Sequence, residues 1–186
     1  MVEADSDNSI MLRVRDGHLE DLGVLFERHH VRLLNFFMKM TGDRAVSEDL
    51  VQESFTRILR YRQSFRGDQG DFVLWMYRLG RSVMVDHFRR SARGRTTELD
   101  EGLALDEPSA LDRIQTEESA RLLQQAILDL SPEKREVLVL HRFHLKSFSE
   151  IAGILDCTVG AAKTRAHRAL LDLRKFYLRR RMKEAR

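Results

Sequence analysis

Apolar residues recur at steps of three and four through most of this chain, which is the spacing of amphipathic α-helices. Clusters of β-branched residues are few, and Pro108 and Pro132 both fall at predicted breaks. The sequence is therefore predicted to be all-α. The pattern predicts a short helix over residues 9–16, longer helices over 18–40, 43–62 and 72–91, and renewed helical periodicity from about residue 114.

Helical periodicity stops between about residues 92 and 112, where the chain is acidic and contains Gly102 and Pro108. We expect this stretch to be a flexible linker between two small helical domains. The predicted boundaries are 9–92 for the first domain, 93–113 for the acidic linker, 114–178 for the second domain and 179–186 for a basic tail that frays.

The second domain contains two predicted helices around a tight turn. Ser147 can cap the first helix, and Glu150 can reach back to complete a capping box. Asp156 and Cys157 interrupt the pattern, and Thr158 can cap the second helix. The apolar residues of the second helix share a face that is predicted to point inward: Val159, Ala162, Ala166, Ala169, Leu170 and Leu173.

Another face of this second helix carries Lys163, Thr164, His167 and Arg168, and almost nothing apolar. Lysine and arginine can bind phosphates or guanine edges, while threonine and histidine can read or position bases. A DNA-binding helix-turn-helix has this arrangement. An ordinary αα-hairpin with a solvated face has it too, so the segment alone leaves both interpretations open.

Charge is unevenly distributed along the 186 residues, although the formal net charge is only +3. Residues 160–186 hold ten lysines and arginines against two acids, whereas residues 95–118 hold eight acids against two arginines. A basic end favours a nucleic-acid partner. One cysteine, a polar N-terminus unlike a signal peptide and the lack of a long apolar run predict a cytoplasmic protein without a membrane partner.

Aromatic and cationic residues alternate through the predicted helix 72–91 and the loop before it. Exposed rings can stack on unpaired bases while arginines follow the phosphates, so this composition favours single-stranded DNA. Phe72, Tyr77 and Phe88 share helical spacing with apolar neighbours, and burial in the core is the better interpretation of these three. A second face is the better candidate surface and comprises Trp75, Arg78, Ser82, Asp86 and Arg89.

Two sets of motifs, in order around a linker, resemble bacterial RNA polymerase sigma factors of the extracytoplasmic-function (ECF) group. The first set resembles region 2 and consists of residues 47–55, 65–68, 75–79, 86 and 89–90. The second set resembles region 4 and consists of residues 130–138, 148–152, 159–160, 163–165 and 167–168. The resemblance implies a protein that directs transcription initiation and is not itself an enzyme.

The resemblance also implies three contact surfaces. Core RNA polymerase, with its largest-type and second-largest subunits, would be bound by a segment that includes Asp49, Gln52, Glu53 and Phe55. Without the resemblance, that charged face would be interpreted as merely solvated. Melted promoter DNA of the −10 element would be held by Phe65, Arg66, Trp75, Arg78, Ser82, Arg89 and Arg90. Duplex DNA of the −35 element would be read by Lys163, Thr164, His167 and Arg168, with Arg165 on a phosphate.

Some positions depart from the family pattern. Ser82 stands where members usually carry asparagine, and because serine is a shorter donor and acceptor the −10 base preference stays open. Gly80 stands where many members carry alanine. Ala162 and Ala166 replace the branched apolar residues of many relatives. The resemblance further implies an anti-sigma partner that clamps the two domains in an inactive arrangement.

No cofactor and no metal site is predicted. His141 and His144 could share a metal with Cys157 nearby, but no further ligand accompanies them. Cys157 is better interpreted as a small buried residue. Two other functions remain open: a stand-alone helix-turn-helix transcription regulator with an N-terminal sensor or dimerisation bundle, and a protein-interaction module that binds no nucleic acid.

Overall fold

The computed structural model describes residues 5–68, 70–93 and 110–184, and these residues contain helices and turns but no strand. The all-α prediction is confirmed. Residues 94–109, which make up most of the predicted linker, lie outside this part. The chain divides into two compact units, one formed largely by residues before 94 and one largely by residues after 109. Each unit is described by itself.

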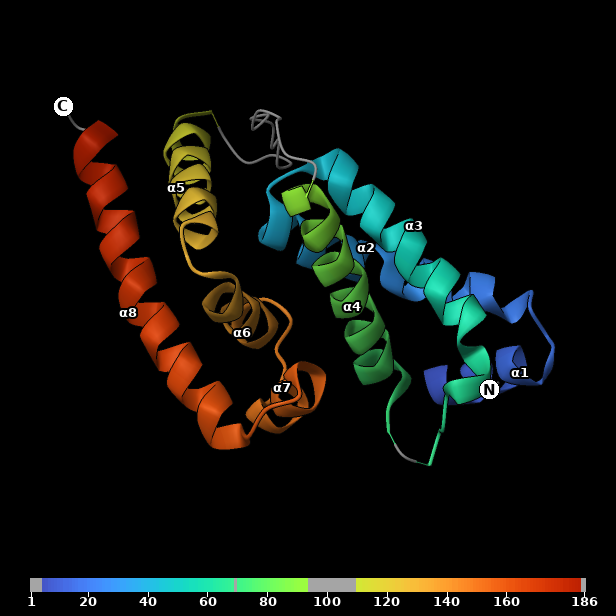
Figure 1. Cartoon of the computed structure of the whole chain (residues 1–186). Coiled ribbons are helices and arrows are strands. Elements are labelled where there is room, and N and C mark those ends of the chain that lie inside the picture. The colour runs from blue at the N-terminus through green and yellow to red at the C-terminus, as the bar shows by residue number, and fades with distance from the viewer. Residues whose placement is uncertain (1–4, 69, 94–109, 185–186) are drawn as a thin grey trace. The chain divides into compact units, whose positions relative to one another are not determined.

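The N-terminal unit contains α1 (Asp7–Asp16), α2 (Asp21–Thr41), α3 (Arg44–Arg60), the short 3₁₀ helix η1 (Arg62–Ser64) and α4 (Phe72–Arg93) (Figure 1). Its core is aromatic and aliphatic. The side chains that are almost completely buried in it include Phe36, Phe37, Ile58, Met76 and Tyr77. Burial raises the pKa of the Tyr77 phenol well above its usual range.

A turn separates α1 from α2, so α2 begins three residues later than predicted. Gly17 adopts the left-handed conformation, with φ 117°, and ends α1. Residues 18–20 form a turn in which the amide of Asp21 donates to the carbonyl of His18 at 3.2 Å. Leu19 lies in this turn and is 45% exposed, although it shares the apolar spacing of the helix predicted over residues 18–40.

Gly80 lies where α4 comes very close to α2 and α3. A Cβ atom at this position would lie 3.3 Å from both Leu33 Cδ1 and Phe37 Cζ, and 3.6 Å from Ser54 Oγ. The first two distances are tight, so the glycine allows α4 to approach α2 closely. This crossing gives a physical reason for glycine where many family members have alanine.

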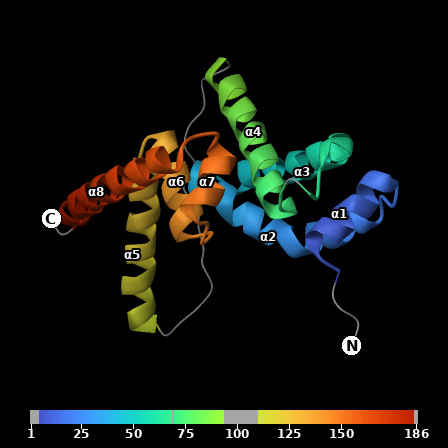
Figure 2. The same ribbon diagram turned by 90° about the horizontal axis from the view of Figure 1, so that it is seen from below.

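The C-terminal unit contains α5 (Ala110–Leu128), α6 (Pro132–Arg142), α7 (Phe148–Leu155) and α8 (Val159–Glu184). Pro132, at a predicted break, occupies the first turn of α6, and the Ser131 side chain before it makes no capping hydrogen bond. Helix α8 packs along both α5 and α6, and Figure 2 shows α5 and α8 from below. Buried side chains of this unit include Leu122, Ile127, Val137, Leu140, Ala162, Ala166 and Ala169.

The basic tail is helical as far as Glu184, so the expectation that residues 179–186 fray is wrong for residues 179–184. Arg180 holds the Asp129 carboxylate with two hydrogen bonds of 2.8 Å. Arg121 Nη2 lies 2.5 Å from Glu184 Oε1. These ion pairs join the end of α8 to α5 and to Asp129, the residue that follows α5.

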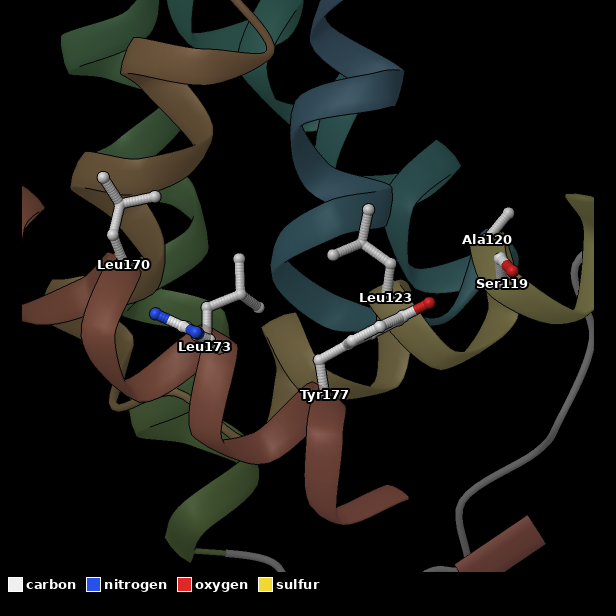
Figure 3. A pocket seen from close by; sticks show the side chains of 7 residues that line it. Ser119, Ala120, Leu123, Leu170, Leu173 and Tyr177 are labelled. Atoms are coloured by element: carbon white, nitrogen blue, oxygen red, sulfur yellow. The ribbon is translucent and has the colours of Figure 1, made fainter. Parts of the chain in front are cut away.

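Between α5 and α8 lies a hollow of about 450 Å³ (Figure 3). Leu123 on α5 and Leu170, Leu173 and Tyr177 on α8 supply most of its apolar lining. Leu170 was predicted to be a core residue, but it borders this hollow and is 38% exposed.

Candidate nucleic-acid interface

The turn between α7 and α8 is built by local hydrogen bonds that the sequence pattern predicted. Ser147 Oγ accepts from the Glu150 amide at 3.2 Å, and Glu150 Oε2 accepts from the Ser147 amide at 2.7 Å. Asp156 adopts the left-handed conformation at the end of α7, with φ 51°. Thr158 Oγ1 accepts from the Ala161 amide at 3.1 Å. Half-buried Cys157 lies in this turn.

The N-terminal part of α8 has a buried alanine face and an exposed polar face. Ala162 and Ala166 are 0% and 4% exposed. Val159 was expected on this inward face but is 41% exposed at the first position of the helix. The side chains that lie exposed on the polar face are Lys163, Thr164, His167 and Arg168. Half-buried Arg165 has its Nε 3.9 Å from Glu133 Oε2.

The Glu150 carboxyl contributes a pH-dependent part of the stability of α7. Partial burial acts to raise its pKa, but hydrogen bonds from the backbone and side chain of Ser147, and from Lys146, outweigh that effect and lower the pKa below its ordinary 4.5. A carboxyl with a lowered folded-state pKa stabilises the fold above its unfolded pKa, and that contribution is lost as the pH falls through the folded-state value.

We therefore expect hydrogen-exchange protection of α7 to fall as the pH drops below about 4.5, and Glu150→Gln to flatten this dependence. Glutamine keeps a carbonyl oxygen for the Ser147 amide but does not titrate. Native-state exchange of the α7 amides at several pH values measures this effect. Equal slopes for the wild type and the variant would assign the acid sensitivity to other groups.

On α3, two of the residues predicted to bind polymerase are exposed and two are held within the unit. Asp49 and Gln52 are exposed. Glu53 is half-buried, and its Oε1 accepts from Arg57 Nε at 3.1 Å. Phe55 is only 6% exposed and packs edge-on against Phe26, with ring centroids 4.9 Å apart. In this structure Phe55 is therefore a core residue that packs α3 against α2.

Arg57 joins α3 to α4, a connection that the sequence analysis did not identify. Its Nη1 lies 2.8 Å from Asp86 Oδ2 and donates to Ser82 Oγ at 3.2 Å. Partial burial acts to lower the Arg57 pKa, but the bonds to Asp86 and Glu53 raise it. One guanidinium therefore links a predicted polymerase contact to two positions of the predicted −10 face.

The loop before α4 has buried aromatic anchors at both ends. Phe65 is 1% exposed and Phe72 is 0% exposed. Phe65 was expected among the DNA contacts, yet its ring lies in the core, 5.3 Å from the half-buried Trp75 ring. Phe72 and Tyr77 are buried as predicted, whereas Phe88 is 40% exposed, contrary to the core interpretation. The remaining predicted −10 contacts are all exposed: Arg66, Arg78, Ser82, Arg89 and Arg90.

The histidine pair considered for metal binding has other contacts. His141 Nδ1 lies 3.0 Å from the Lys146 carbonyl oxygen, and its ring stacks on Phe148 with centroids 4.3 Å apart. Among the described residues, no group of three metal-ligating side chains comes together. No helix in the same residues combines the length and apolar character needed to cross a bilayer.

Comparison with known proteins identifies both halves of the chain. Residues 25–94 match sigma-70 region 2, and residues 120–173 match sigma-70 region 4. RNA polymerase sigma factor YlaC of Bacillus subtilis is 30% identical over 164 residues, covering 85% of this chain and 92% of YlaC. ECF RNA polymerase sigma factor BldN of Streptomyces coelicolor is 30% identical over 178 residues, covering 91% of this chain and 67% of BldN.

Two solved structures share this fold. CnrH, solved in complex with the cytosolic domain of CnrY, matches with a TM-score of 0.69 at 25% identity, over 92% of this chain and 96% of CnrH. The sigma factor RpoE of Bartonella quintana, solved with the anti-sigma factor NepR, shares the fold, with a TM-score of 0.68 at 21% identity over 84% and 96% of the two chains.

A region 2 followed by a region 4 defines the sigma-70 class of transcription initiation factors. The chain belongs to the ECF group of RNA polymerase sigma factors, as the sequence resemblance predicted. Its role is promoter recognition and transcription initiation, and the family is one of initiation factors and not of catalysts.

Proposed function

We propose that this sigma factor docks on core RNA polymerase in the cytoplasm through α3, holds the melted −10 strand with α4 and its preceding loop, and reads the duplex −35 element with α8. The observation that carries the proposal is the exposed face of α8 over buried Ala162 and Ala166. The alanine face packs α8 against the rest of its unit, and the opposite polar face is exposed and can contact DNA.

The proposed −35 contacts divide by chemistry. Lys163 and Arg168 can donate to guanine edges or phosphates, and His167 can donate or accept at a base edge. The Thr164 hydroxyl donates to the Gly160 carbonyl at 2.9 Å, so its oxygen remains able to accept. Half-buried Arg165 is assigned to a phosphate, because its position beside Glu133 restricts its reach.

Arg168→Ala is expected to weaken binding by about 1–3 kcal/mol at one −35 position if the guanidinium reads a base. Competition binding of the holoenzyme to a set of single-base −35 variants measures the loss at each position. Arg181→Ala, which removes an exposed cation near the end of α8, is the matched control and should affect all sequences equally. A uniform loss for Arg168→Ala would make that residue a phosphate contact.

The proposed −10 surface combines one partly exposed indole with nearby cations. Trp75 can stack on an unpaired base, and Arg66, Arg78, Arg89 and Arg90 can follow the backbone. Ser82 is shorter than the asparagine common in the family, and its hydroxyl already accepts from Arg57. We infer that Ser82 acts on the −10 strand as a donor held by Arg57.

We propose a polymerase contact centred on Asp49 and Gln52, because these are exposed α3 residues whose side chains can bind a basic helix. Half-buried Glu53, whose Oε1 accepts from Arg57, lies next to them on α3 and joins that contact. We further propose regulation by an anti-sigma protein. The complexes of CnrH with CnrY and of RpoE with NepR support such a partner.

The helix-turn-helix alone would also suit a stand-alone regulator. Run-off transcription separates the two functions: a sigma factor yields a promoter-dependent product when added to core polymerase, and a stand-alone regulator does not. The DNA that copurifies with the reconstituted holoenzyme supplies the candidate promoters. An absence of product from every enriched promoter would favour the regulator.

A further inference from the structure

We propose that Asn8 on α1 is a positioning residue that holds the loop before α4 in the shape required to grip the −10 strand. Helix α1 lies outside residues 25–94, which match region 2. This inference rests on the proposed −10 function of the loop. It adds a residue that neither the motifs nor the family match points to.

The Asn8 amide makes hydrogen bonds to the backbone at three points of residues 67–72. Its Nδ2 donates to the Gly70 carbonyl at 3.1 Å and to the Gly67 carbonyl at 3.4 Å. Its Oδ1 accepts from the Phe72 amide at 2.7 Å, at the first residue of α4. One side chain thus bonds to Gly67 and Gly70 in the loop and to Phe72 at the start of α4.

Asn8 is itself held in place, because α1 is firmly attached to the rest of the unit. Asp7 Oδ2 lies 2.7 Å from His29 Nε2, and its Oδ1 accepts from Arg28 Nη1 at 2.8 Å, both on α2. Ile10, Met11 and Val14 are at most 1% exposed. The Asp7–His29 contact is part-buried and the Asp7–Arg28 bond is exposed, and together they attach α1 to α2 (Figure 1).

The loop backbone also lies directly on α1. A Cβ atom at Gly67 would be 3.2 Å from Leu12 Cδ1, so the loop passes close to this helix. Gln63 Nε2 donates to the Arg15 carbonyl at 2.7 Å and attaches η1 to the other end of α1. Residues 67 and 70 are glycines, so neither position has a side chain that could hold the loop. The Asn8 amide holds the loop there instead, by bonding to the carbonyls of both glycines.

The restraint acts on the groups proposed to touch DNA. Phe65 and Phe72 bracket the loop, and the Trp75 ring packs against both, with centroids 5.3 and 6.3 Å away. Exposed Arg66 lies on the loop itself. A loop fixed before binding does not have to be ordered by the DNA, which preserves affinity. Loss of the Asn8 bonds should therefore weaken the grip on the strand.

Two variants separate the functions of the amide. Asn8→Asp keeps an oxygen for the Phe72 amide but removes both donors to the loop carbonyls, and Asn8→Ala removes all three bonds. Asp16→Asn, at an exposed position on the same helix, is the control. Trp75 is the only tryptophan in the sequence, so its fluorescence reports on this loop without a label.

Both Asn8 variants should make Trp75 more accessible to acrylamide, whereas Asp16→Asn should match the wild type. Hydrogen exchange at the Phe72 amide should speed up in Asn8→Ala and stay close to wild type in Asn8→Asp. Holoenzyme carrying either variant should bind the single-stranded −10 oligonucleotide about three- to tenfold more weakly, with −35 duplex binding unchanged. A generally destabilised protein would instead lose hydrogen-exchange protection throughout the N-terminal unit and not only at the Phe72 amide.

Unchanged Trp75 quenching and unchanged −10 binding in Asn8→Asp would overturn the inference. Failure of the proposed function gives a different result, because the wild-type holoenzyme itself would then not bind the −10 oligonucleotide. Quenching and exchange need no DNA, so they would still show whether Asn8 holds the loop.

Discussion

Trp75→Ala is expected to impair open-complex formation while −35 duplex binding stays intact. The half-buried indole lies on α4, three residues before exposed Arg78, and stacking of a base on such a ring contributes about 1–3 kcal/mol. We expect the variant holoenzyme to hold the melted −10 strand about 5- to 150-fold more weakly. Permanganate reactivity of the −10 thymines measures melting directly.

Tyr61→Ala is the matched control for this variant. Tyr61 is an aromatic residue of the same unit and is 49% exposed, but it lies outside the proposed −10 surface. Its removal should leave thymine reactivity unchanged. Normal reactivity in Trp75→Ala would show that this ring only packs on Phe65 and Phe72 and does not contact the bases.

Lysine in place of Asp49 and Gln52 on α3 should greatly weaken binding to the polymerase without unfolding the protein. Asp49 and Gln52 are exposed, so lysine at both positions adds no buried charge and should change the free energy of unfolding by less than about 0.5 kcal/mol per site. Against a basic partner helix, like charges cost several kcal/mol. We expect Asp49→Lys with Gln52→Lys to reduce affinity for core polymerase by at least about a hundredfold.

Asp16→Lys is the control, since it reverses an exposed carboxylate on α1 and leaves α3 unchanged. Surface plasmon resonance on immobilised core polymerase compares the three proteins. Equal affinity for the wild type and the double variant would place the polymerase contact elsewhere on the chain.

The existence of the helices and the caps at Ser147 and Thr158 were predictable because their signals are local. Ser147 and Glu150 lie three residues apart, and their capping box forms as the sequence predicted. The polar face of α8 followed from helical spacing for the same reason. Family motifs then assigned these local features to regions 2 and 4.

Contacts between distant segments were not predictable from local pattern. Asn8 meets Phe72 across 64 residues, and Arg57 meets Ser82 across 25. Whether an aromatic residue is buried also depends on packing between helices, so Phe65 and Phe88 differ from their expected environments. The end of α8 makes ion pairs with Arg121 and Asp129, more than fifty residues away, which no periodicity signals.

Association between this chain and core RNA polymerase is the central requirement of the proposed function. Size-exclusion chromatography of the purified chain mixed with core polymerase measures it at submicromolar concentration. We predict saturable co-elution of one chain per polymerase, which the lysine substitutions at Asp49 and Gln52 abolish. Separate elution of the wild-type chain and polymerase at every mixing ratio would contradict the account.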